Sequence, residues 1–177
     1  MMLDVVDFCE VLPSEAISPD LNQNADIYGW LIGSWSVDVT DYDLGDAPRK
    51  SKGEWHFSRV LEGRAIQDVF IAPVRGSREG IGKEANRYGT TVRFYDPSID
   101  AWHISWFNPV RAVKNELIAR RKGNDIVQEG KLEDGTLMRW SFLDIQTDSF
   151  RWLGESSNDA GKTWKLGAEF LAKRKSL

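Results

Sequence analysis

Apolar and polar residues alternate without a break from residue 34 to residue 40. Trp35, Val37 and Val39 fall on one side of this segment, and the residues between them are serine, aspartate or threonine. A period of two is typical of a β-strand with one buried and one solvated face. Gly33 allows the chain to bend sharply just before the strand, so we expect the Trp35 indole to lie buried beneath the sheet.

Similar segments recur along the rest of the chain. They cover residues 54–60, 65–72, 88–95, 101–107, 113–121, 125–131, 137–145, 150–156 and 164–173. Turns rich in Gly, Pro, Asn and Asp separate most of them, and no segment after residue 33 has a helical period. About ten short strands joined mainly by hairpins predict an all-β fold, a single up-and-down antiparallel barrel, because closing the sheet removes its exposed edges. The loop at 74–87 is rich in Gly and charge, and we expect it to be mobile near one barrel rim.

This pattern divides the chain into an N-terminal extension, residues 1–24, and a barrel domain, residues 25–177. Scattered apolar residues in the extension, among them Val5, Val6 and Phe8, predict a short helix within residues 4–12. The extension is interpreted in three ways, as a frayed segment, as a flap over a barrel mouth or as a contact in a homodimer.

Composition narrows the class of protein. The net charge of -4, with both signs interspersed, argues against a nucleic-acid groove or an anionic membrane surface as partner. No run approaches the roughly 20 apolar residues that span a bilayer. The first residues lack the basic flank and apolar core of a secretion signal. We therefore expect a cytoplasmic protein with neither a nucleic-acid nor a membrane partner.

Aromatic residues are frequent, with 8 Trp and 8 Phe in 177 residues. The alternation places many of them on one predicted inner wall, which comprises Trp55, Phe57, Trp102, Trp106, Trp140, Phe142 and Trp152. Side chains just fill a barrel of about eight strands, and a wider barrel leaves space. The surplus of indoles therefore indicates a cavity for a small hydrophobic or aromatic ligand.

Several polar residues share registers with apolar ones. Asp68 alternates with Ile66 and Phe70, and a carboxylate inside an aromatic cavity is a candidate general acid or base. The alternatives are that Asp68 pairs with an arginine, or that Gln67, Val69 and Ile71 form the inner face instead. Four further residues are expected to be either satisfied core groups or ligand contacts, namely Tyr88, Thr90, Asn115 and Gln128.

Both histidines lie between bulky apolar neighbours. His56 is flanked by Trp55 and Phe57, and His103 by Trp102 and Ile104, so alternation turns both imidazoles away from the inner face. We therefore expect no metal site and no cofactor.

Residues 157–164 resemble the Asp-box hairpin, Ser-x-Asp-x-Gly-x-Thr-Trp. Asp159 can accept backbone N–H groups within the turn, Gly161 can adopt a positive φ, and Trp164 can pack beneath it. We interpret this hairpin as a structural turn, with sugar binding as the alternative.

Three segments together resemble the uncharacterised bacterial lipocalin-like, or calycin-like, domains. They are Trp-Leu-Ile-Gly-Ser-Trp at 30–35, Glu-Gly-Arg-Ala-Ile-Gln-Asp-Val at 62–69 and Gly-Lys-Thr-Trp at 161–164. The resemblance implies an up-and-down barrel around an internal cavity, with Trp35 at its closed end beneath Lys173 or Arg174. Haem-binding nitrobindins of this fold group hold iron through a late histidine, whereas this sequence has none after His103.

Three hypotheses for function follow. The first is binding of a small hydrophobic or aromatic molecule in the barrel. The second is a cofactor-independent isomerase, cyclase or lyase that uses Asp68, and the third is a structural or interaction domain with a filled barrel. The expected ligand contacts are Trp55, Phe57, Asp68, Tyr88, Thr90, Trp102, Trp106, Asn115, Trp140 and Trp152.

Overall fold

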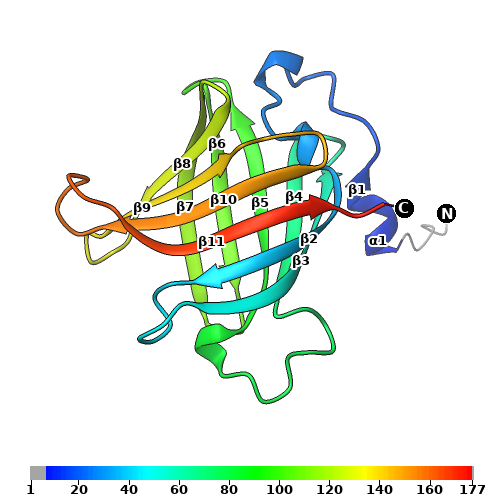
Figure 1. Cartoon of the computed structure of the whole chain (residues 1–177). Helices are drawn as coiled ribbons and strands as arrows, with labels where there is room; N and C mark the ends of the chain where they lie inside the picture. The colour runs from blue at the N-terminus through cyan, green and yellow to red at the C-terminus, as the bar shows by residue number, and fades with distance from the viewer. Residues whose placement is uncertain (1–6, 177) are drawn as a thin grey trace.

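The computed structural model describes residues 7–176, which form a closed antiparallel barrel of ten strands (Figure 1). The barrel strands are β2 (Gly33–Asp41), β3 (Arg49–Val60), β4 (Ala65–Ala72), β5 (Arg87–Asp96), β6 (Ala101–Asn108), β7 (Val113–Lys122), β8 (Asp125–Lys131), β9 (Leu137–Leu143), β10 (Ser149–Ser157) and β11 (Lys165–Arg174). Each strand pairs with its neighbours in the chain, and β11 closes the barrel against β2. The predicted up-and-down barrel is confirmed.

One strand lies outside the barrel wall. β1 (Pro13–Ser14) pairs with the end of β3, where Pro13 lies opposite Val60. The only α-helix of the described part of the chain, α1 (Phe8–Val11), falls within the helix predicted for residues 4–12, of which residues 4–6 lie outside the described residues. No helix of residues 7–176 has the length and apolar character needed to cross a membrane.

The N-terminal segment closes one end of the barrel. It crosses that end at the upper right of Figure 1 before the chain enters β2. Its 3-10 turns are η1 (Gln23–Ala25) and η2 (Gly29–Leu31). Tyr28 and Leu31 are fully buried among the barrel side chains, and the Trp102 indole donates a hydrogen bond of 2.8 Å to the Ala25 carbonyl. We call residues 25–32 the plug.

Trp35 lies at this closed end, as predicted, and is fully buried. Arg174 covers it, with the guanidinium carbon 4.1 Å from the ring centroid. The same guanidinium donates to the carbonyls of Trp30 at 2.6 Å and Ile32 at 2.8 Å. Arg174, rather than Lys173, is therefore the basic residue over the tryptophan. Gly33 makes room for it, since its φ is +122° and a Cβ there would lie 3.0 Å from Arg174 Nη1.

The hairpin between β10 and β11 has the hydrogen bonds of an Asp-box. Asp159 accepts from the Thr163 backbone N–H at 2.9 Å and from its hydroxyl at 2.5 Å. These bonds lower the pKa of Asp159 to about 2, with the Thr163 hydroxyl as the largest cause. The Trp164 indole donates to the Gly161 carbonyl at 3.2 Å, and Arg139 lies 4.0 Å above the indole ring.

Candidate ligand-binding cavity

The barrel interior contains a cavity of about 450 Å³. Its lining runs from Trp55 in the interior to Asp43, Arg111 and Leu132, which lie in turns at the end of the barrel away from the plug. The β4–β5 loop and the β10–β11 hairpin also project from this open end (Figure 1). The cavity is therefore closed by the plug at one end and bordered by loops at the other.

Stacked aromatic rings form much of the cavity wall, and we call them the aromatic arc. Trp152 stacks on Phe170 with ring centroids 4.4 Å apart, and Phe170 stacks on Phe70 at 4.9 Å. Trp140 extends the row beyond Trp152 at 5.8 Å, and Trp106 extends it beyond Phe70 at 6.5 Å. Because the five rings support one another, the arc offers a preformed apolar surface.

Two glycines allow the indoles of the arc to lie against the wall. A Cβ at Gly89 would lie 2.5 Å from Cη2 of Trp106, and one at Gly154 would lie 2.7 Å from Cη2 of Trp152. Any larger residue at either position would push an indole towards the barrel axis. The glycines thus help to keep the lumen open.

A buried ion pair lies at the base of the cavity. Arg93 Nη1 is 2.5 Å from Asp68 Oδ2, and both side chains are almost fully buried. Asp68 also accepts a 3.3 Å hydrogen bond from the Thr91 backbone N–H. Asp68 therefore faces inward, but it pairs with an arginine, which was the alternative to the acid–base hypothesis. Arg93, and not Asp68, is among the residues that line the cavity.

The plug contributes Tyr28 to the same region. Its hydroxyl donates a 3.0 Å hydrogen bond to Gln128 Oε1, and Arg93 Cζ lies 5.4 Å from its ring centroid. Burial raises the pKa of Tyr28 well above its usual range, against the opposing effect of the Arg93 charge. Tyr28 is thus a neutral donor at working pH, and it links the plug to the cavity base.

Four polar atoms of lining residues are buried without a hydrogen-bond partner among residues 7–176. They are Trp55 Nε1, Arg93 Nε, Asn108 Oδ1 and Gln128 Nε2. Buried polar groups in proteins are nearly always paired, because an unpaired one costs free energy. Four of the five such atoms in the described residues belong to residues that line this one cavity.

Two of the charged lining residues near the open end, Arg87 and Glu155, form salt bridges. Arg87 forms two contacts with the Asp41 carboxylate, one of them a 3.0 Å hydrogen bond, and Glu155 accepts from Arg139 at 2.9 Å. Arg111 takes part in no salt bridge within residues 7–176. Arg111 is therefore the one arginine of the cavity lining that has no carboxylate partner within residues 7–176.

The structure brings together half of the expected contact residues. Those that line the cavity are Trp55, Trp106, Asn115, Trp140 and Trp152. Phe57 and Trp102 also face inward but are packed near the closed end, Phe57 against Trp55 at 5.0 Å and Trp102 against Tyr28 at 5.2 Å. Neither is among the lining residues.

The register predicted for Tyr88 and Thr90 is wrong. Gly89 and Thr91 are the buried residues of this part of β5, so Tyr88 and Thr90 point outward. Tyr88 is 42% exposed and lies beneath the Arg78 guanidinium. The Thr90 hydroxyl donates to the Asp68 carbonyl at 2.6 Å and accepts from Gln67 at 2.9 Å.

The expected ligand contacts did not include three arginines and two phenylalanines of the lining. Phe70 and Phe170 complete the aromatic arc, and Arg87, Arg93 and Arg111 line the cavity. The available signal for Arg93 was indirect, namely that an inward Asp68 requires a cation nearby. Phe70 alternates with Asp68 on the same strand, so its position followed from the face of Asp68.

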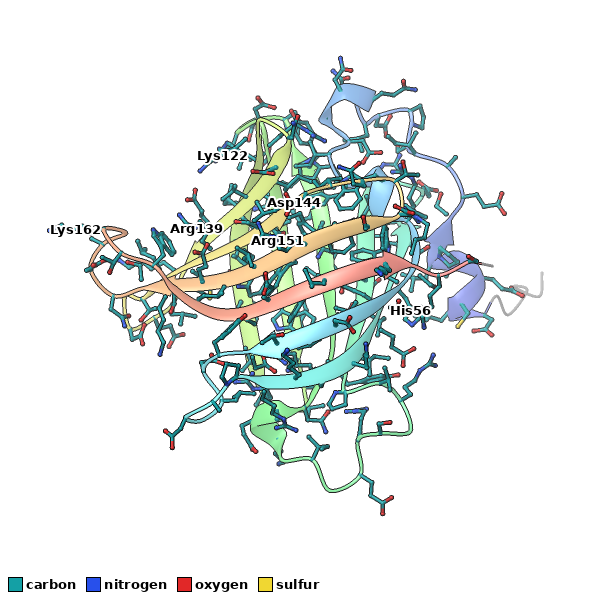
Figure 2. The ribbon with its side chains drawn as sticks, in the orientation of Figure 1. His56, Lys122, Arg139, Asp144, Arg151 and Lys162 are labelled. Atoms are coloured by element: carbon teal, nitrogen blue, oxygen red, sulfur yellow. The ribbon has the colours of Figure 1, made fainter. Side chains whose placement is uncertain are left out.

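Both histidines face outward, as predicted (Figure 2 labels His56). His56 Nδ1 lies 2.8 Å from the Ser34 hydroxyl, and its Nε2 lies 3.0 Å from Glu54 Oε2. Arg75 binds both oxygens of Glu54 at 2.9 Å and lowers the pKa of this carboxyl to about 2. None of these residues lines the cavity, and the cluster attaches the β4–β5 loop to β3.

The fold and its cavity define a lipocalin-like antiparallel barrel. No protein-family model matches the chain, and no curated protein matches it. The S-type phycobiliprotein lyase CPES from Guillardia theta has a similar structure, with a TM-score of 0.55, 9% identity, and coverage of 84% of this chain and 90% of its own. Rv2717c from M. tuberculosis is also similar, with a TM-score of 0.53, 12% identity, and coverage of 89% and 100%. These likenesses support the fold of the chain.

Proposed function

We propose that this protein binds a small, largely apolar or aromatic molecule inside the barrel. The observation that carries the proposal is the cavity of about 450 Å³, walled by aromatic rings and closed by the plug at one end only. Its volume falls within the range of small-molecule sites, which is about 300–1,000 Å³. A filled structural barrel is not favoured, because the aromatic arc lies along the wall of this cavity.

The aromatic arc suits a flat ligand. Trp106, Trp140 and Trp152 all line the cavity, and the last of these already stacks on Phe170, which lines the cavity beside it. A flat molecule that lies between such rings buries apolar area on both faces. This burial favours binding by about 25 cal/mol per Å² before the entropic costs of ordering are subtracted. Stacking geometry adds to this gain.

No observation favours the enzyme alternative over binding. Asp68, its candidate acid or base, is held by Arg93 and the Thr91 backbone, and it is not among the lining residues. The similarity to a phycobiliprotein lyase concerns the fold at 9% identity, so it brings no reaction to this chain. Binding therefore remains the function best supported by the residues of the cavity.

Fluorescence titration tests the proposal. A panel of fatty acids, flat aromatics and terpenoids is added to the wild type, to Trp106→Leu and to Phe107→Leu, while tryptophan emission is recorded. Phe107 is the matched control, because it follows Trp106 on β6 and lies on the outer face with 37% exposure. We expect saturable quenching by flat aromatics that Trp106→Leu weakens and Phe107→Leu does not. Absence of quenching across the panel, with no co-purified ligand in native mass spectra, would refute the proposal.

A further inference from the structure

The base of the cavity is rich in unused hydrogen-bond donors. The Trp55 indole N–H, the Arg93 Nε–H and the Gln128 amide nitrogen have no partner among the described residues. All three side chains are at least nine-tenths buried, and all three residues line the cavity. Because water does not reach these atoms, their hydrogen bonds are lost unless another group supplies an acceptor.

The orientation of the Gln128 amide is set by the plug. The Tyr28 hydroxyl donates to Gln128 Oε1, and the buried Tyr28 retains its proton. The amide oxygen is therefore occupied, and the amide nitrogen remains as a donor. Tyr28 thus satisfies the amide oxygen and leaves the amide nitrogen as the group of Gln128 that has no partner among the described residues.

The charge of Arg93 is already balanced. Asp68 contacts Nη1, and the pair as a whole carries no net charge. Other groups packed against the guanidinium are the neutral rings of Tyr28 and Phe57, at 5.4 Å and 5.5 Å. The base of the cavity therefore offers N–H donors without an uncompensated positive charge.

We propose that this base recognises a neutral oxygen acceptor, the carbonyl of a ketone, ester or amide, carried by a flat apolar ligand. The inference rests on the proposed function and adds the chemical class of the ligand. A carbonyl oxygen accepts hydrogen bonds without bringing a charge into the aromatic interior. A carboxylate would compete with Asp68 for Arg93 and would leave one buried anion unpaired.

The donors come from movable side chains. Gln128 ends in an amide at the tip of a flexible chain, so a change of rotamer can bring Nε2 to the cavity surface, and a small rotation of the guanidinium that keeps the contact with Asp68 can turn Arg93 Nε the same way. Such side-chain adjustments are common on ligand binding even where the backbone stays in place. The Trp55 indole N–H is covered in the same way, so it reaches a ligand only after a comparable shift of the indole.

Three naphthalene probes of similar shape test this inference. They are 2-acetonaphthone, which carries a ketone, 2-ethylnaphthalene, which carries no acceptor, and 2-naphthoate, which carries a carboxylate. Equilibrium dialysis against the wild-type protein at pH 7 gives the three dissociation constants. We expect 2-acetonaphthone to bind more tightly than 2-naphthoate, by about tenfold, because the carboxylate must be desolvated without a free counter-charge.

Two variants remove donors and one serves as the control. Gln128→Met deletes the amide at similar length, and Trp55→Phe deletes the indole N–H. We expect each variant to raise the dissociation constant of 2-acetonaphthone about five- to tenfold and that of 2-ethylnaphthalene less than twofold. Trp106→Phe, on the aromatic arc, should weaken both probes alike. Thermal melts verify folding, and Trp55→Phe carries the test if Gln128→Met does not fold.

The outcomes separate the two proposals. Tighter binding of 2-naphthoate than of 2-acetonaphthone would overturn the neutral acceptor in favour of a carboxylate ligand. Equal losses of affinity for the ketone and the hydrocarbon in both donor variants would show that the base of the cavity does not recognise a carbonyl acceptor. The proposal that the cavity binds apolar molecules would still stand. If none of the probes and none of the fluorescence panel binds, both proposals fall together.

Discussion

Arg174 lies over the Trp35 ring at 4.1 Å and at the same time caps the plug through two carbonyl oxygens. A third bond, from Nε to the Thr147 carbonyl at 2.9 Å, ties the β9–β10 turn to the same side chain. One guanidinium on β11 thus contacts β2, the plug and the β9–β10 turn. This relationship closes the barrel at the end opposite the cavity mouth.

Arg174→Met should therefore destabilise the whole fold. Methionine keeps the apolar stem but leaves three carbonyls without their donor, and we expect a loss of about 2–4 kcal/mol in the free energy of unfolding. Urea denaturation followed by tryptophan emission measures it. Lys173→Met, at the adjacent exposed position of β11, is the control and should change stability by less than about 0.5 kcal/mol. Equal effects of the two changes would contradict this assignment.

Asp68→Asn should be strongly destabilising although it preserves side-chain shape. It leaves the Arg93 charge buried and uncompensated, which costs about 3–5 kcal/mol. The control is Asp38→Asn, which breaks an exposed pair with Lys52 and should cost less than about 1 kcal/mol. Adding Arg93→Met to Asp68→Asn should restore part of the stability. A single-variant loss no larger than that of the control would refute the ion pair.

Gly89→Ala should reduce both stability and ligand binding. A Cβ at Gly89 would lie 2.3 Å from the Phe107 carbonyl oxygen and 2.5 Å from the Trp106 ring, so backbone and indole must shift. We expect a loss of about 1–3 kcal/mol, as for other overpacked sites. In Gly82→Ala the new Cβ meets only the flexible Glu84 side chain, and this variant is the control. Calorimetric melts compare the two, and similar melting temperatures would contradict the prediction.

Glu54 should contribute to acid sensitivity. Its folded-state pKa is lowered from 4.5 to about 2, chiefly by the Arg75 hydrogen bonds. A carboxyl with a lowered folded-state pKa stabilises the protein above its unfolded pKa, and this contribution is lost as pH falls from 4.5 towards 2.

The variant Glu54→Gln tests the contribution of Glu54 to acid sensitivity. Its stability should fall less steeply with decreasing pH over that window than the stability of the wild type, as measured by urea midpoints at a series of pH values. Glu79→Gln, an exposed change in the β4–β5 loop, is the control. Parallel pH profiles for Glu54→Gln and the wild type would show that the carboxyl does not act in this way.

Much of the fold was predictable from local patterns. β4 and β8 have the predicted bounds, and most other strands differ from prediction by one or two residues at an end. β3 begins earlier than expected, at Arg49, because pairing with β2 extends a polar segment that has no alternation of its own. Burial on one side of a strand requires a period of two, so the sequence carries this information directly.

The faces of the strands were predictable only where apolar residues mark one side. In β2, Trp35, Val37 and Val39 are the apolar residues and all lie on one face, so that face is the buried one. In β5 one face carries Gly89, Thr91 and Arg93, and the opposite face carries Val92 and Phe94. Local hydrophobicity therefore favours the wrong face, and this is why Tyr88 and Thr90 were misplaced.

The sequence by itself determined the number and order of the strands, the burial of Trp35 and the aromatic character of the interior. Only the tertiary structure decided that Arg93 lies inside, where Asp68 on β4 neutralises its charge. It also decided that Tyr28 from the plug reaches Gln128, a contact between residues 100 positions apart. The pairing of strands sets which side chains meet, and desolvation allows a charge inside only where a counter-charge on another strand meets it.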